Sequence, residues 1–311
     1  MSTAAVESPF EGASRFSITH HHLHGVIATA LAGRSDASPV RILDVGCGSG
    51  SLIEFLQSGL TRAFPGRVIE IHGFDVTDSR VQKADFFAAT LQRLAASHGG
   101  VDWSSRLSVI TSAHDWPYPD DHFDFVVSNQ VMEHVRDHAR VFAQVARVMR
   151  PDGLSAHLFP LADSWTEWHL KMPFAHWFDN ADLLEAWIRV ASRLGLGTWK
   201  KYCREVEPVP LETFARMNRD FVALETHYVT ERQIRYFAKL AGLKYSFRYT
   251  DDLYGNRWRL ARGKPLRYQF APRGPWASRL RFIAYRRIST ICLVLEKGNT
   301  YVNRGFHAPG A

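Results

Sequence analysis

The sequence has few cysteines and no long apolar run. Its three cysteines, Cys47, Cys203 and Cys292, lie far apart and form no Cys-x-x-Cys pair. They are too few for a disulfide framework, so a reducing cytosol is the expected compartment. No apolar stretch reaches the roughly 18 residues that a membrane-spanning helix needs. Residues 1–16 carry acids and lack an apolar segment, so we do not expect a secretory signal there.

Acidic residues are missing from one stretch near the C-terminus. Residues 253–295 contain ten basic residues and no acidic one, and the rest of the chain is net acidic although the overall charge is +7. Within this stretch, residues 276–288 place apolar side chains on one helical face with arginines beside it. The apolar residues are Trp276, Leu280, Ile283, Ala284 and Ile288, and the arginines are Arg279, Arg281, Arg286 and Arg287.

This cationic, amphipathic pattern requires a partner of opposite charge. It suits anionic lipid headgroups or a pyrophosphate-linked acceptor, and it could equally serve nucleic acid. The plainer alternative is a solvated face that lies against a local acidic surface. Because no RNA-binding module is recognisable in the sequence, nucleic acid is not the expected partner. We expect a cytoplasmic protein that contacts the inner face of an anionic membrane through residues 276–288.

Strand-like and helical patterns alternate along residues 41–160. Apolar, β-branched runs of strand type occupy residues 41–46, 68–77, 106–113, 123–130 and 154–160, with helical patterns between them. This alternation predicts a mostly parallel sheet covered by helices on both faces.

The alternation stops between residues 161 and 229 and then resumes. Two helices are expected in this interval, at about 180–194 and 211–227, and we interpret the whole interval as a helical insertion and substrate lid. Thr230 and Gln233 then form a capping-box pair at the start of a further helix. The predicted organisation is a helical extension (1–40), a ligand-binding core (41–160), the insertion (161–229) and a C-terminal completion of the sheet (230–311).

A glycine-rich loop follows the first predicted strand. Residues 42–50 read ILDVGCGSG, which places glycines at positions 46, 48 and 50. Glycine lets a ligand approach the backbone closely, and the following helix directs its N–H groups at that ligand. The dinucleotide fingerprint needs its third glycine where this chain has Ser51. Asp44 would also repel a phosphate, so the expected ligand is cationic and lacks phosphate.

Two motifs together resemble a known family. The loop resembles the first motif of the class I S-adenosylmethionine-dependent methyltransferases. Residues 123–135, FDFVVSNQVMEHV, resemble the fourth-strand motif of their type 11 group, which also contains ubiquinone-pathway methyltransferases. The resemblance implies a three-layer α/β/α Rossmann-like methyltransferase fold with a mostly parallel seven-stranded sheet and a helical insertion after strand 5. The alternative is another nucleotide-binding α/β domain, such as a dehydrogenase.

The resemblance also implies where S-adenosylmethionine binds. The family uses an acid at the position of Asp75 to accept both ribose hydroxyls, although Asp75 could instead cap a helix. The family holds the adenine amino group with an Asp-Ala pair, whose acid is replaced here by Ser112; Asp115 is the alternative acid. The expected cofactor-binding residues are Asp44, Gly46, Cys47, Gly48, Gly50, Asp75, Val76, Ser112, Ala113, Asn129 and Gln130.

Methyl transfer to a hydroxyl needs alignment and a base, and histidine is best suited near neutral pH. The candidate catalytic residues are His134, His157, His169 and His176. For His134, packing or a cofactor-side role is the alternative. Glu133 and His134 could also help to hold a divalent metal, as in some ubiquinone-pathway relatives, but no metal is expected.

Aromatic residues accompany the last two histidines. Such rings suit a sugar or a planar acceptor, or they form an aromatic core under the insertion; they are Trp165, Trp168, Phe174, Trp177 and Phe178. The prediction for the whole chain is an S-adenosylmethionine-dependent methyltransferase that O-methylates a small molecule or a sugar of a surface glycan. The alternatives are an RNA or protein methyltransferase, a quinone-precursor methyltransferase and a ligand-binding scaffold.

Overall fold

The computed structural model describes residues 17–34, 38–78, 86–271 and 274–298. Its seven-stranded sheet has the order β3-β2-β1-β4-β5-β9-β8, in which β9 alone runs antiparallel to its neighbours β5 and β8. The mostly parallel sheet predicted from the sequence is therefore confirmed. The strands are β1 (Val40–Val45), β2 (Ile69–Val76), β3 (Leu107–Ile110), β4 (Phe123–Asn129), β5 (Met149–Pro160), β8 (Leu243–Ser246) and β9 (Thr290–Lys297).

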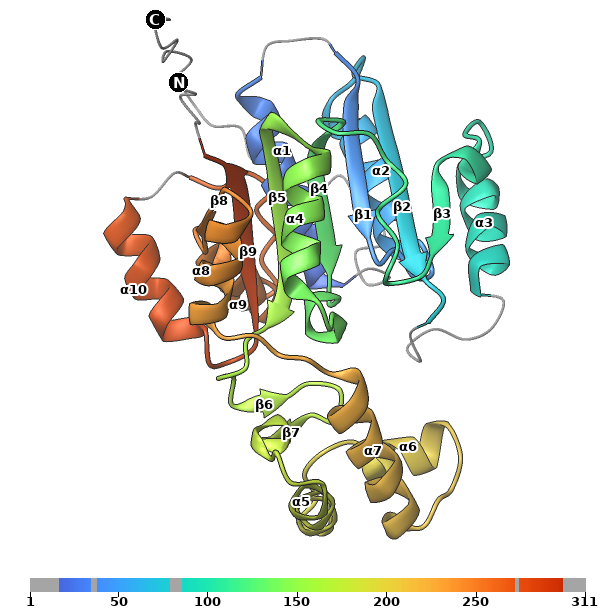
Figure 1. Ribbon diagram of the computed structural model, residues 1–311, viewed down its shortest axis with the longest axis vertical. Coiled ribbons are helices and arrows are strands. Elements are labelled where there is room, and N and C mark those ends of the chain that lie inside the picture. Colours follow the sequence, from blue (N-terminus) through green and yellow to red (C-terminus); the bar gives the residue numbers. More distant parts are fainter. Residues whose placement is uncertain (1–16, 35–37, 79–85, 272–273, 299–311) are drawn as a thin grey trace, which may run out of the picture.

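Helices cover both faces of the sheet, which gives the three expected layers (Figure 1). The strands are apolar on both sides, so successive residues enter opposite cores. Ile42 packs into one core, whereas Leu43 packs into the other. One face is covered by α1 (Ile18–Ala32), α2 (Ser51–Ala63), α3 (Phe86–Ser97) and α9 (Thr250–Ala261), and the other by α4 (His138–Val148), α8 (Glu231–Leu240) and α10 (Pro275–Tyr285). None of the described helices is long and apolar enough to cross a bilayer.

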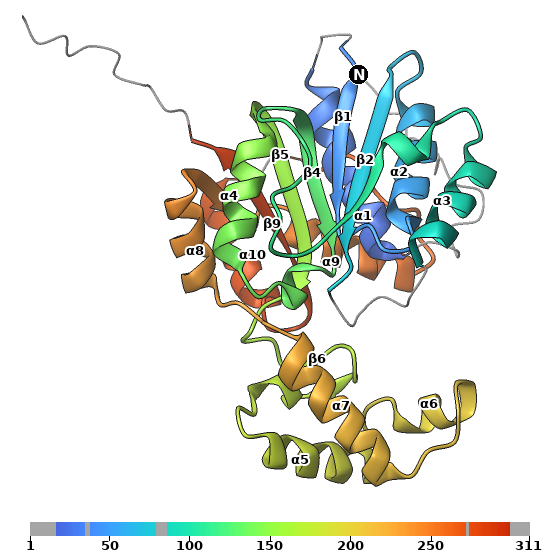
Figure 2. The same ribbon diagram turned by 45° about the vertical axis from the view of Figure 1, so that its right-hand side comes forward.

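Residues 161–229 project from the sheet edge at which the parallel strands end (Figure 2). They have an apolar core of their own, in which Leu184, Ile188 and Phe214 are buried. Separate burial explains why the strand–helix alternation stops here. The segment contains β6 (Thr166–Glu167), β7 (Met172–Pro173), α5 (Ala181–Arg193), α6 (Trp199–Glu205) and α7 (Leu211–Glu225).

Helix α1 belongs to the core layer, although the sequence suggested an extension. Ser17 caps it by accepting a hydrogen bond from the His20 backbone N–H. His22 is fully buried and stacks on Phe270 with ring centroids 5.1 Å apart. Neither ring nitrogen of His22 has a hydrogen-bond partner among the described residues. Burial, together with the charge of Arg257, lowers the pKa of His22 to about 3.

This buried histidine predicts acid sensitivity. Below pH 6.5 the unfolded chain binds a proton that folded His22 accepts only near pH 3, so the free energy of unfolding falls as the pH drops through this window. We expect a loss of about 3 kcal/mol from this residue by pH 4.5. Urea unfolding followed by circular dichroism should show a shallower decline for His22→Leu. His114→Leu, at an exposed site, is the control, and identical slopes for all three proteins would contradict the prediction.

Candidate active site

The loop between β1 and α2 requires its glycines. Gly46, Gly48 and Gly50 have φ angles of +71°, +48° and +71°, a region that side chains disfavour. A Cβ at position 46 would lie 2.6 Å from a methyl carbon of Val131, and one at position 50 would lie 2.9 Å from Leu94. The first glycine therefore fits the loop against the end of β4, and the last lets α3 pack on α2.

A cavity of about 460 Å³ lies beside this loop, at the carboxyl ends of the parallel strands. Ligands bind at this edge in open α/β sheets. Gly50 and Ala113 do not line the cavity, in contrast to the sequence prediction. The other predicted cofactor residues all line it, namely Asp44, Gly46, Cys47, Gly48, Asp75, Val76, Ser112, Asn129 and Gln130.

Two carboxyl groups make the cavity favourable for a cation. Asp44 is buried, and its Oδ2 has no hydrogen-bond partner among the described residues. Burial, and then the charge of Asp75, raise the pKa of Asp44 well above its usual range. Asp75 accepts hydrogen bonds from the backbone N–H groups of Gly48, at 2.6 Å, and Val76, at 2.7 Å. A bound cation would compensate the first carboxyl, whereas a phosphate would be repelled.

The end of the cavity at which the resemblance places the adenine differs in detail from the sequence prediction. Ser112 donates hydrogen bonds to the Asp78 carboxylate from its backbone N–H, at 2.9 Å, and its hydroxyl, at 2.6 Å. Both residues line the cavity, so an acid is present here, but it comes from the segment after β2. Asp115 instead binds Arg140 and Gln144 and does not line the cavity. The prediction that Asp115 substitutes for the family acid is therefore wrong.

His134 lines the same cavity and connects it to the insertion. Its Nδ1 lies 2.6 Å from the carbonyl oxygen of Glu225, at the end of α7, and its Nε2 lies 3.2 Å from Nε2 of His169. Nδ1 of His169 lies 2.6 Å from the Glu167 carboxylate, which also accepts a hydrogen bond from Tyr228. A carbonyl and a carboxylate only accept, so each Nδ1 carries a proton and the two Nε2 atoms face one another.

Glu133 stands next to this pair and is fully buried. Neither of its carboxyl oxygens has a hydrogen-bond partner among the described residues, and burial raises the pKa of Glu133 to about 7. One ligand atom each from Glu133, His134 and His169 lies within 4.8 Å of the other two. This set could hold a divalent cation, although the sequence analysis expected none.

His157 and His176 do not line the cavity, and neither does His169, which is linked to it through His134. His157 is fully buried within the sheet, and its ring nitrogens bind Ser128, at 2.8 Å, and Ser155, at 2.5 Å. Burial lowers the pKa of His157 to about 3. His176 lies 3.4 Å from the Ser164 hydroxyl and packs against Tyr228. We therefore assign neither His157 nor His176 a catalytic role.

The structure adds cavity residues that the motifs did not indicate. They come from α1, from the segment before β4 and from the start of α4, regions that carry no recognised motif; they include His20, Trp116, Arg136 and Arg140. Four of the five aromatic residues that the sequence analysis singled out in the insertion do not belong to a core under it. Four are exposed, namely Trp165, Trp168, Phe174 and Trp177, whereas Phe178 packs on the insertion core.

This fold and site define a class I methyltransferase, and comparison with known proteins agrees. Residues 19–201 match a family model described as a methyltransferase domain. The chain belongs to this family, the S-adenosylmethionine-dependent methyltransferases, as the two motifs suggested. The glycine loop and the carboxyl groups of Asp44 and Asp75 fit S-adenosylmethionine, which is the cofactor of this class.

Individual relatives match only part of the chain. The ubiquinone biosynthesis O-methyltransferase of Neisseria meningitidis is 29% identical over 44% of this chain and 50% of its own length. The 2-phytyl-1,4-naphtoquinone methyltransferase of Synechococcus elongatus is 36% identical over 38% of this chain and 45% of its own length. This chain therefore spans about half the length of either. The solved YcgJ protein of Bacillus subtilis is 17% identical, with a TM-score of 0.42 over 90% of this chain and all of that one.

Asp75 provides a direct test of the cofactor site. Asp75→Ala removes the carboxylate that is expected to accept hydrogen bonds from both ribose hydroxyls. Each such charge-assisted hydrogen bond contributes about 1.5–3 kcal/mol to binding. We expect the affinity for S-adenosylmethionine in isothermal titration calorimetry to fall about 100-fold or more. Asp120→Ala, at an exposed carboxylate that pairs with Arg147, should bind normally. Near-unchanged affinity of a folded Asp75→Ala protein would refute the assignment.

Proposed function

We propose that this protein transfers a methyl group from S-adenosylmethionine to a hydroxyl of a small molecule or of a sugar in a surface glycan. The observation that supports a hydroxyl acceptor is the His134–His169 pair, because His134 lines the same cavity as the carboxyl groups of Asp44 and Asp75. Asp44 and Asp75 thus suit the cationic donor, and His134 provides a base for the acceptor in the same cavity.

In this mechanism the chain mainly aligns two reactants and removes one proton. When bound, S-adenosylmethionine supplies a methyl group that its sulfonium makes electrophilic. Asp44 and Asp75 would hold the donor, and Nε2 of His134 would take the proton of the acceptor hydroxyl as its oxygen gains the methyl group. The bond between that methyl carbon and the sulfur would break at the same time, so that the donor leaves as a neutral thioether. The lone pairs of two neutral Nε2 atoms 3.2 Å apart repel one another, which favours uptake of that proton. The Glu167 carboxylate balances the resulting charge through His169.

The names of the relatives favour one particular acceptor class as a second candidate. Two of the similar proteins described above are named for ubiquinone biosynthesis or for a naphthoquinone. A quinone precursor is planar and carries a ring hydroxyl, so the same base would serve it. Incubation of the purified protein with methyl-labelled donor and fractionated bacterial extract would identify the product. Label in RNA or protein would contradict a small-molecule acceptor.

His134 should be needed for turnover but not for binding of the donor. General-base catalysis typically contributes about 10²–10⁴-fold, so His134→Asn should lower kcat by about that factor. His169→Gln should lower kcat less, because His169 acts through His134. Both variants should keep the calorimetric affinity for S-adenosylmethionine. His176→Gln, outside the cavity, should retain normal turnover, and equal activity of all four proteins would exclude the histidine pair.

The same assay distinguishes a proton-accepting histidine pair from a metal site. Proton uptake by the Nε2 atoms of His134 and His169 needs no metal ion, so we expect protein dialysed against EDTA to keep its activity. Loss of activity that added Mg²⁺ or Zn²⁺ restores would instead assign Glu133, His134 and His169 as metal ligands. Direct metal analysis of the protein before and after dialysis completes the comparison.

A further inference from the structure

Helix α10 exposes large apolar side chains along its outer face. The exposed fractions are 84% for Trp276, 67% for Leu280 and 51% for Ile283, and Ile288, just beyond the helix, is 41% exposed. The first three are four and three residues apart, so they form one stripe along the helix. We call these four residues the α10 stripe. Contiguous exposed apolar residues of this kind mark interaction sites.

The opposite face of α10 is fixed against the domain. Phe282 is buried and stacks on Phe247 with ring centroids 3.9 Å apart and ring planes 4° from parallel. Tyr285 stacks in the same manner on Tyr254 of α9, at 4.3 Å and 6°. Two stacked pairs define the rotation of the helix about its axis. The α10 stripe is therefore a true outer face.

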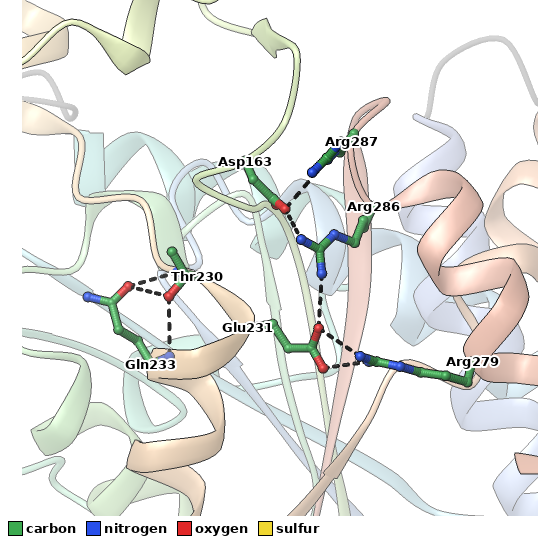
Figure 3. Close-up of polar contacts among 7 residues, drawn as sticks. All are labelled: Asp163, Thr230, Glu231, Gln233, Arg279, Arg286 and Arg287. Carbon is green, nitrogen blue, oxygen red and sulfur yellow. Dashed lines mark hydrogen bonds and ion pairs between the residues drawn. The ribbon is translucent and has the colours of Figure 1, made fainter. Parts of the chain in front are cut away.

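Ion pairs hold the same helix along its length (Figure 3). Arg279 and Arg286 both bind the Glu231 carboxylate at the start of α8, and Arg286 also binds Asp163. Arg281 pairs with Asp251 at 3.0 Å. The sequence analysis left a local acidic surface open as the alternative partner of this tract, and these arginines do have acidic partners within the chain.

The charges are nevertheless arranged with the cations outermost. The side chains of Arg279 and Arg281 are about half exposed, whereas their partners Glu231 and Asp251 are buried. Helix α8, joined to α10 through Glu231, adds three further exposed cations, Arg232, Arg235 and Lys239. No described carboxylate forms an ion pair with any of these three. The surface around the α10 stripe is thus positive.

We propose that α10 docks the protein on an anionic lipid bilayer. The helix lies parallel to the membrane, with the α10 stripe in the interface and the cations of α8 and α10 on lipid headgroups. A tryptophan and aliphatic residues on one face, with cations at the margins, are the features of interfacial helices. A bilayer is favoured over an acidic protein because the stripe is apolar and its cations surround it.

The docking surface continues onto the insertion. The backbone N–H of Trp165 donates a 2.7 Å hydrogen bond to the carbonyl oxygen of Arg287, which places the half-exposed Trp165 next to the end of α10. A bilayer under α10 would therefore also lie near the β6–β7 hairpin. This arrangement brings the insertion, which carries His169, towards the lipid surface.

Vesicle co-sedimentation tests this proposal with the whole chain. We expect binding to vesicles of phosphatidylcholine with 30% phosphatidylserine, weakened at high salt, and little binding to pure phosphatidylcholine. The double variant Leu280→Glu/Ile283→Glu should bind anionic vesicles at least about tenfold more weakly. Leu183→Glu, at a similarly exposed leucine of α5, is the matched control and should bind like the unchanged protein.

Three outcomes would overturn the proposal. The first is no binding to either vesicle, and the second is equal binding by the double variant and the control. The third is a different partner for the α10 stripe. It would be seen either as a concentration-dependent dimer in sedimentation or as a gel shift with RNA, in each case absent from the double variant. Circular dichroism and calorimetric binding of S-adenosylmethionine confirm that each variant is folded.

Discussion

The site depends on the buried carboxyl group of Asp44, one oxygen of which has no hydrogen-bond partner among the described residues. Asp44 lies near the carboxyl end of β1, a central strand of the sheet. This end of the strand meets the cavity beside the glycine loop. Burial makes its charged form costly, and the nearby Asp75 increases that cost. The loop can bring a ligand close enough to compensate only because Gly46 and Gly48 adopt positive φ angles. The preference for a cationic, phosphate-free donor thus follows from the backbone as much as from charge.

The acceptor side is built by a different part of the chain. The core contributes His134, whereas the insertion contributes His169 and Glu167 and, through α7, the carbonyl of Glu225. These contacts cross between a sheet domain and a segment that has its own apolar core. A change in the position of the insertion would therefore alter the base, whereas the glycine loop, Asp44 and Asp75 of the donor pocket belong to the core. Such a division lets one donor site serve different acceptors.

Local patterns were sufficient to predict the sheet, the glycine loop and the Thr230–Gln233 capping box, which Figure 3 also shows. Features that depend on contacts distant in sequence could not be predicted. His157 seemed available on the fifth strand, but its partner Ser128 lies on β4, and only the strand register brings the two together. Helix α9, too, was not predicted, because its buried residues pack against α1 and α10, and such contacts leave no local pattern in the sequence.

The arginines of α10 illustrate the same limit in electrostatics. Composition alone shows ten basic residues without a local acid between residues 253 and 295, yet Glu231 and Asp163 reach α10 from far along the chain. Because Glu231 is buried, loss of its arginine partners would leave an uncompensated carboxylate. The same arginines extend into solvent beside the α10 stripe. A change of these arginines would therefore alter both the stability of the fold and the surface charge. The residues of the α10 stripe, by contrast, can be changed without destabilising the fold.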